Sequence, residues 1–141
     1  MTRILFVCHG NICRSPMAEF IMKHIAPEVE CASAATSFEE IGNEMYSSAK
    51  QILRENGIPY TRHLARRICS SDYDDYDMII GMDESNMRSI LRFFGGDPEH
   101  KISMFLDRPV ADPWYYGNFE KTYDDLLEGC QKLKAELAGR Q

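Results

Sequence analysis

The feature that most constrains the fold of this chain is a regular alternation of short apolar runs with amphipathic segments. Four runs have the length and apolar content of strands, namely 3–8, 29–34, 76–82 and 101–105. Each is followed by a segment whose apolar residues recur at helical spacing, namely Met17–Ile25, Ala49–Leu53, Met87–Phe94 and Phe119–Leu137. Strands that are joined through helices run parallel and are connected by right-handed crossovers. We therefore predict a four-stranded parallel sheet with helices on both faces.

The length of 141 residues is that of one domain, and we expect residues 1–141 to form a single unit. The predicted class is α/β, and the sheet is expected to be doubly wound and flavodoxin-like, with the strand 3–8 in its interior. Ligands of such sheets bind at the carboxyl ends of the strands. The functional site is therefore expected where the first strand ends, at Cys8.

The charge balance limits the partners that the chain can bind. Sixteen Lys and Arg residues oppose 22 Asp and Glu residues, so the net charge is −6 at pH 7. Affinity for nucleic acid or for an anionic membrane surface requires a basic face, and we expect neither partner. No apolar run approaches the roughly 18 residues of a membrane span, and the first residues do not resemble a signal peptide. The expected location is the cytoplasm.

The cysteines and histidines follow neither a disulfide pattern nor a metal-binding pattern. The chain has five cysteines, and because an odd number cannot all pair within one chain, we expect reduced thiols. No CxxC pair occurs, and the four histidines are scattered, so we predict no structural metal. Cys31 lies in an apolar run and Cys130 on the apolar face of the last helix, and both are expected in the core.

The segment from Cys8 to Pro16 (CHGNICRSP) connects the first strand to the first helix. We expect Ser15 to be the N-cap of that helix and Pro16 its first residue. A helix N-terminus attracts anions through its free N–H groups and its dipole, and Gly10 lets the backbone curl so that further N–H groups converge. Arg14 adds a planar cation that can bind two phosphate oxygens. We predict an anion site that Cys8 faces.

A cysteine in such surroundings has a lowered pKa, and a thiolate beneath a phosphate group can attack phosphorus. A C-x5-R spacing alone often arises by chance, in which case the cysteine is a core residue and the arginine a surface cation. Here the strand–loop–helix context, Gly10 and Ser15-Pro16 all agree with an anion site. We therefore interpret Cys8 as a nucleophile. The nucleotide-binding pattern GxxxxGK[ST] does not occur in the sequence.

The segment VCHGNICRSP resembles the signature of the low-molecular-weight protein tyrosine phosphatases, in which C-x5-R-[ST]-P directly follows the first strand. Asp112-Pro113, followed by aromatic residues, is similar to the loop that carries the general acid of this family. Two further segments resemble family motifs, namely 83–86 (DESN) and 63–66 (HLAR). The likeness covers essentially the whole chain and implies the phosphotyrosine phosphatase I type of flavodoxin-like fold.

The resemblance also implies the chemistry. Cys8 would form a phosphocysteine, Arg14 would bind the phosphate and stabilise the transition state, and Asp112 would protonate the leaving phenol and then activate water. By itself Asp112 could simply begin a turn, as Asp-Pro pairs often do, and Asp107 is a weaker alternative for the acid. The implied substrate is a phosphotyrosine protein or a small aryl phosphate, hydrolysed without metal or cofactor.

Further residues are assigned to the site by the same resemblance. The phosphate-binding loop would comprise His9, Gly10, Asn11, Ile12, Cys13 and Ser15. Asn11 would hold the loop's shape, and the Ser15 hydroxyl would point at the Cys8 sulfur. His63 and Asp83 would brace the loop from behind. Cys13 would form a reversible disulfide with Cys8, unless it is only a small packing residue.

The substrate rim is expected to be aromatic, with Phe38, Trp114 and Tyr115 as its candidates, because aromatic walls favour an aryl phosphate. Many family members read D-P-Y-Y-G, whereas this chain reads D-P-W-Y-Y-G and has one aromatic residue more. Trp114 is the preferred wall, and Tyr116 could instead pack against the last helix. Isoleucine at position 12 resembles the pattern of the tyrosine phosphatases, since the related protein-arginine phosphatases have threonine at the matching position.

Three alternatives to the tyrosine phosphatase remain. One is a protein-arginine phosphatase. Another is a thioredoxin-linked arsenate reductase, which needs two further cysteines close together, whereas only Cys69 lies in the relevant region. The last is a non-catalytic phosphate-binding module, against which Asp112 argues. We expect the chain to act as a monomer.

Overall fold

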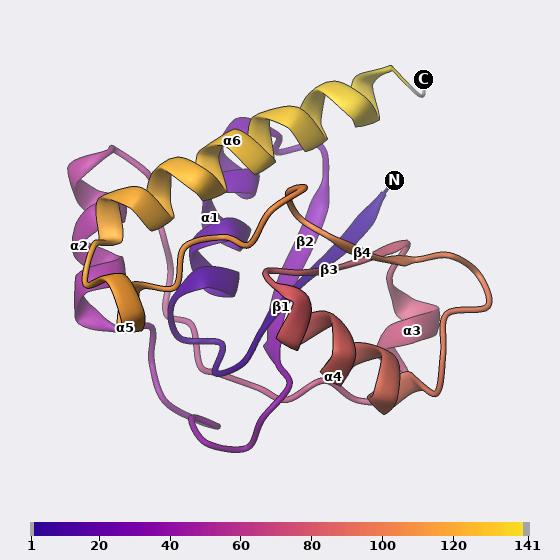
Figure 1. The fold of residues 1–141 in the computed structure, drawn as a ribbon. Coiled ribbons are helices and arrows are strands. Elements are labelled where there is room, and N and C mark those ends of the chain that lie inside the picture. The colour runs from indigo at the N-terminus through magenta and orange to yellow at the C-terminus, as the bar shows by residue number, and fades with distance from the viewer. Residues whose placement is uncertain (1, 140–141) are drawn as a thin grey trace.

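A four-stranded parallel sheet lies at the centre of the molecule (Figure 1). The computed structural model describes residues 2–139, and for Tyr115 and Tyr116 it describes the backbone only. The strands are β1 (Arg3–Cys8), β2 (Glu30–Ala35), β3 (Met78–Gly81) and β4 (Ile102–Met104). Their order is β2-β1-β3-β4, and every neighbouring pair is parallel. The α/β class and the interior position of the first strand are therefore confirmed.

The four predicted helices are present, and two short ones accompany them. The long helices are α1 (Arg14–Ile25), α2 (Ser47–Glu55), α4 (Glu84–Phe94) and α6 (Phe119–Ala138). The two that the sequence pattern did not predict are α3 (Asp72–Asp75) and α5 (Pro113–Tyr116). Each contains a single turn, which is too short for an apolar periodicity to appear. Among the described residues, no helix has the length and apolar content that crossing a bilayer requires.

The side chains of β1 alternate between two cores. Ile4 and Phe6 belong to a large cluster that α1, α2 and α6 complete on one face of the sheet. Leu5 and Val7 belong to a smaller cluster on the other face, which Ile90 of α4 joins. In Figure 1, α1 and α6 lie side by side over one face, while α3 and α4 cover the other. Because β1 is buried on both faces, its carboxyl end is held firmly, and the loop that follows starts from a fixed point.

Gly129 lies where α6 crosses the ring of Phe105. A Cβ built on Gly129 would stand 2.8 Å from two ring carbons of Phe105, closer than real contacts allow. The Phe105 ring cannot easily withdraw, because it packs against Phe6 with 5.3 Å between ring centroids.

We expect Gly129→Ala to lower the free energy of unfolding by about 1–3 kcal/mol through overpacking. This loss should appear although alanine has the better helix propensity, by about 1 kcal/mol. Urea unfolding measures it. Gly139→Ala at the end of α6 is the matched control, since its added Cβ meets only ordinary contacts at 3.6 Å and beyond. Equal stability of Gly129→Ala and the wild type would contradict the close approach.

Candidate active site

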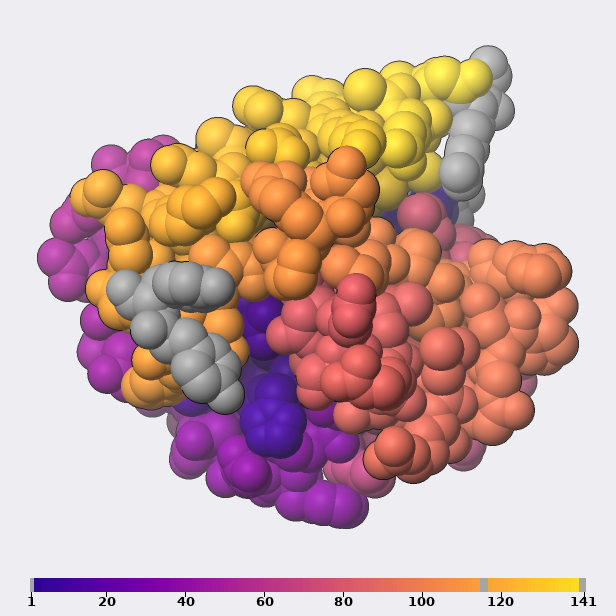
Figure 2. All heavy atoms as spheres, in the orientation of Figure 1, coloured from indigo at the N-terminus to yellow at the C-terminus, as the bar shows by residue number. Residues whose placement is uncertain are grey.

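The loop between β1 and α1 forms the floor of a pocket of about 610 Å³. Residues from Cys8 to Arg14 line it together with residues from three other segments, 39–40, 83–86 and 112–114. These residues are Glu39, Glu40, Asp83, Ser85, Asn86, Asp112 and Trp114. Figure 2 shows indigo atoms of the N-terminal part between the orange segment that precedes α6 and the red-pink segment of α4. The carboxyl end of the first strand is thus the site of the cleft, as a parallel α/β sheet favours.

The Cys8 sulfur is enclosed by polar groups of its own loop. Its Sγ lies 3.0 Å from Ser15 Oγ, and the backbone N–H of Asn11 donates to it at 3.3 Å. The prediction that Ser15 caps α1 is wrong: the N-cap is Cys13, whose side chain makes no capping bond, and the helix begins at Arg14. The Ser15 hydroxyl is engaged elsewhere, because it also accepts from Asn11 Nδ2 at 2.8 Å. The hydroxyl thus joins Cys8 to Asn11 within the loop.

Asn11, and not Gly10, supplies the unusual backbone conformation of the loop. Asn11 has φ 60°, in the left-handed region, whereas Gly10 is not among the residues with positive φ. Asparagine tolerates this region better than most residues. The Asn11 side chain is fully buried, and its Oδ1 accepts from the backbone N–H of Arg66 at 3.2 Å. Tertiary bonds thus hold the turn that was expected to depend on glycine.

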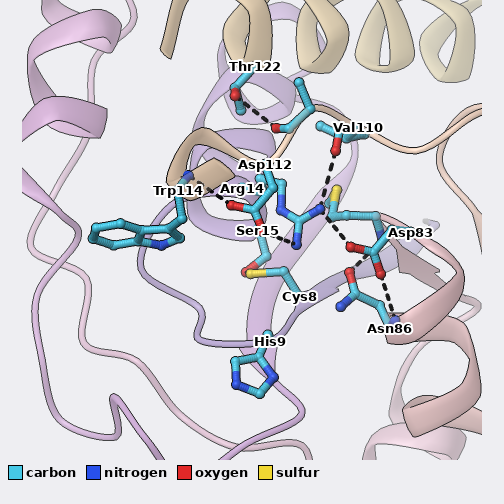
Figure 3. A network of polar contacts seen from close by, with 12 residues as sticks. Cys8, His9, Arg14, Ser15, Asp83, Asn86, Val110, Asp112, Trp114 and Thr122 are labelled. Carbon is cyan, nitrogen blue, oxygen red and sulfur yellow. Dashed lines mark hydrogen bonds and ion pairs between the residues drawn. The ribbon is translucent and has the colours of Figure 1, made fainter. Parts of the chain in front are cut away.

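Arg14 reaches from the first turn of α1 into the pocket, where it bridges two carboxylates (Figure 3). Its Nη1 donates to Asp83 Oδ2 at 2.9 Å and to the carbonyl of Val110 at 3.2 Å. Its Nη2 lies 3.5 Å from Asp112 Oδ2. Burial by itself would lower the pKa of the Arg14 guanidinium, but the negative charges of Cys8, Asp112 and Asp83 outweigh burial and raise the pKa. Arg14 therefore stays protonated throughout the working pH range.

Asp83 joins the start of α4 to the loop between β1 and α1. It is the N-cap of α4, and its Oδ1 accepts from the backbone N–H of Asn86 at 2.7 Å while its Oδ2 holds Arg14. Asn86, which sequence analysis did not single out, is buried and accepts from the backbone N–H of Met82 at 3.1 Å. Asp83 thus caps α4, and the same carboxylate orients the Arg14 guanidinium.

Asp112 enters the pocket from the opposite side. It is the N-cap of α5, where its Oδ1 accepts from the backbone N–H of Trp114 at 3.0 Å. Its other oxygen, Oδ2, faces Arg14, so the carboxyl group is directed at the loop between β1 and α1 (Figure 3). Asp107 does not share this position: its side chain is 88% exposed, and its carboxylate lies 4.0 Å from Arg108.

Comparison with known proteins assigns this arrangement to a family. Residues 3–141 match the family model described as low molecular weight phosphotyrosine protein phosphatase. The chain belongs to this family. It is 37% identical to the low molecular weight protein-tyrosine-phosphatase YfkJ of Bacillus subtilis, with 97% of this chain and 96% of that protein covered.

Solved structures agree with the family in fold. The crystal structure of SP-PTP, a low molecular weight protein tyrosine phosphatase from Streptococcus pyogenes, matches with a TM-score of 0.93 and 39% identity, covering 97% of this chain and 93% of that chain. The drosophila arginine phosphatase DARP matches with a TM-score of 0.84 and 28% identity, covering 97% and 98% of the two chains. The chain is therefore a protein-tyrosine phosphatase by family.

His63 contacts the loop between β1 and α1 of this phosphatase. Its Nε2 is 3.1 Å from Asn11 Oδ1, and because an amide oxygen can only accept, the histidine is the donor. Its Nδ1 lies 3.8 Å from the carboxylate of Glu19, a buried residue of α1 that sequence analysis did not single out. Glu19 Oε1 accepts from Ser33 Oγ at 2.6 Å. The signal for Glu19 was a charge among the apolar positions of the first helix.

The rim of the pocket is only partly the expected aromatic one. Trp114 lines the pocket and is 59% exposed, and its ring meets Tyr46 edge to face at 4.8 Å. Phe38 is not among the lining residues. Its ring packs under the guanidinium of Arg67 at 4.1 Å, and it is therefore drawn away from the pocket. The side chain of Tyr115 lies outside the described residues.

Charged residues occupy the part of the rim that Phe38 was expected to form. Glu39 and Glu40 line the pocket, and Glu39 Oε2 lies 3.1 Å from Nε2 of the exposed His9. Tyr46, a further aromatic neighbour, is placed by its backbone N–H, which donates to the carbonyl of Ile12 at 2.9 Å. Nothing in the local sequence distinguishes Tyr46 from any residue that precedes a helix.

Cys13 lines the pocket and packs in a small cluster with Ile12 and Ala65. Burial raises the pKa of the Cys13 thiol far above its ordinary value, and the charges of Cys8 and Asp112 add to that effect. Cys31 and Cys130 are buried in the core, as expected. Within residues 2–139, no three His, Cys, Asp or Glu side chains are grouped as a metal site would require.

Proposed function

We propose that this phosphatase hydrolyses phosphotyrosine in proteins, or small aryl phosphates, through a phosphocysteine intermediate. The observation that carries the proposal is that Cys8, Arg14 and Asp112, from different segments, line one pocket. They combine a sulfur nucleophile, a permanent cation and a carboxyl group around a volume that admits a phosphate ester. Residues 1–141 would act as one catalytic domain.

In the first step, the Cys8 thiolate attacks phosphorus and the bond from phosphorus to the phenolic oxygen breaks. The carboxylic acid of Asp112 gives its proton to that oxygen, so that a neutral phenol departs. Negative charge on the transferring phosphoryl oxygens is stabilised by Arg14 and by the N–H groups at the start of α1. The uncapped N-terminus of α1 supports this role.

In the second step, water attacks the phosphorus of the phosphocysteine and the Asp112 carboxylate accepts the water's proton. The sulfur–phosphorus bond breaks, releasing inorganic phosphate and the thiolate. The Ser15 hydroxyl, 3.0 Å from Cys8 Sγ, stabilises the departing sulfur by donating to it. The same carboxyl group thus serves as acid and then as base.

Two further residue roles, a cellular location and an oligomeric state belong to this proposal. The Trp114 ring would form a wall for the substrate's phenyl ring. Cys13 would form the reversible disulfide with Cys8 when an oxidant such as a peroxide accepts the two electrons. A thiolate nucleophile functions in a reducing compartment, which supports a cytoplasmic location. Action as a monomer is part of the same proposal.

A protein-arginine phosphatase is the second candidate, because the fold is shared with the drosophila arginine phosphatase. Turnover of phosphotyrosine, phosphoserine and phosphoarginine peptides by the wild type and by Ile12→Thr separates the candidates. We expect the wild type to prefer phosphotyrosine over phosphoserine and phosphoarginine by about a hundredfold in kcat/KM. The sulfur lies at the floor of the pocket, and the aromatic ring at the rim can pack against the phenyl ring of a long aryl ester. Ile12→Thr should shift the preference toward phosphoarginine. A wild-type preference for phosphoarginine would overturn the proposal.

A further inference from the structure

Both peptide groups of Ala111 are held by helix α6, directly before the proposed acid. The backbone N–H of Ala111 donates to Asp125 Oδ2 at 3.0 Å. Its carbonyl accepts from Thr122 Oγ1 at 2.8 Å, a bond drawn in Figure 3. The Ala111 carbonyl and the Asp112 nitrogen belong to one planar peptide unit. By orienting that plane, Thr122 fixes the Cα from which the Asp112 side chain projects.

Asp125 is a buried carboxylate with three donors. It is 2% exposed, and besides Ala111 it binds Arg108 Nη2 at 2.9 Å and Lys121 Nζ at 2.8 Å. Burial would raise the pKa of Asp125, but these donors outweigh burial and lower the pKa. A buried charge is costly unless it is fully paired. The partners of Asp125 include Arg108 and Ala111, so the pairing connects α6 to the segment 108–111 at two points.

The segment that carries Asp112 is otherwise held by the site itself. The backbone N–H of Val110 donates to the carbonyl of Met82 at 2.9 Å, and the Val110 carbonyl accepts from Arg14. These bonds fix Val110, two residues before the acid. The contacts of Thr122 and Asp125 are the ones that act on the next residue, Ala111. They come from the far side of the segment, from a helix that does not line the pocket.

We propose that Thr122 and Asp125 are positioning residues for the acid step, because they hold the Ala111 peptide groups and thereby keep the Asp112 carboxyl group within reach of the leaving oxygen. This inference rests on the proposed function. Neither side chain touches the substrate pocket. They act only through Asp112, so their loss should affect proton donation to the leaving group and spare phosphate binding.

The dependence of kcat/KM on the leaving group tests the inference. 4-Nitrophenyl phosphate releases a good leaving group that needs little protonation, whereas phenyl phosphate and phosphotyrosine need the acid. We expect Thr122→Val and Asp125→Ala to lower kcat/KM about tenfold for phenyl phosphate and about twofold for 4-nitrophenyl phosphate. Thr122→Ser, which keeps the hydroxyl, should restore the wild-type ratio. Asp124→Asn is the matched control, since Asp124 is the exposed neighbour of Asp125.

Asp112→Asn separates failure of this inference from failure of the proposed function. If Asp112→Asn leaves the leaving-group dependence unchanged, the acid assignment in the proposed function is wrong. If Asp112→Asn makes kcat/KM depend more strongly on the leaving group but Thr122→Val does not, only the positioning role is overturned. An equal fall for both substrates would show a merely structural role and would also overturn it. Thr122→Val and Thr122→Ser decide the matter even if Asp125→Ala does not fold.

Discussion

Cys8→Ser is expected to abolish turnover of phosphotyrosine, lowering kcat by about 10⁴-fold or more. The Asn11 N–H donates to the sulfur and the Ser15 hydroxyl contacts it, whereas the serine hydroxyl of the variant stays protonated at neutral pH and is a poor nucleophile without a base. Steady-state hydrolysis of phosphotyrosine measures the loss. The smaller oxygen fits the site of the sulfur, so the loop should keep its shape.

Two measurements make this result specific to the nucleophile. Cys8→Ser should still bind inorganic phosphate, because Arg14 and the helix N-terminus remain. Calorimetry measures this binding. Cys69→Ser makes the same chemical change at an exposed thiol and should retain activity within about twofold. A Cys8→Ser protein with more than about one hundredth of the wild-type rate would contradict the phosphocysteine mechanism.

Arg14→Lys should lower kcat/KM about 10³-fold although the positive charge is kept. Arg14 is 5% exposed and uses its two Nη atoms on different partners, Asp83 on one side and Asp112 on the other. A lysine ammonium is a single point and cannot hold both carboxylates and two phosphate oxygens in one plane. The change therefore damages phosphate binding and the placement of the acid together.

Arg92→Lys is the control for this substitution, since Arg92 is an exposed residue near the end of α4. Inhibition by inorganic phosphate provides the second reading, and its inhibition constant should rise in Arg14→Lys. A variant that keeps kcat/KM within about threefold of the wild type would mean that charge alone suffices and that the fork geometry has no role.

Local sequence determined the framework of the site. The run from Arg3 to Cys8 is apolar throughout and forms the interior strand, and the loop and helix that follow are adjacent in sequence, so short-range rules place them. Asp83 and Asp112 begin helices, as their residue type favours. The long helices could be located because a helix spans neighbours whose periodicity the sequence displays, although α1 begins at Arg14 and not at Pro16.

Some local rules failed where a distant partner competed. Ser15 was expected to cap α1, yet its hydroxyl bonds to Cys8 and Asn11. Gly10 was expected to supply the bend, yet Asn11 does so because Arg66 and His63, more than fifty positions along the chain, hold its side chain. Such partners compensate for a strained backbone, and residue type alone does not reveal them.

The sequence by itself determined which residues can do the chemistry: a cysteine at a strand end, an arginine in the next turn and an acid before a proline. Only the tertiary structure decided their arrangement. Arg14 meets the segment of the acid through Val110, 96 positions away, and α6 orients that segment through Thr122 and Asp125. These contacts depend on how helices pack on the sheet, which is the sum of many burial terms across the whole chain. A pattern among neighbouring residues does not predict the outcome of that sum.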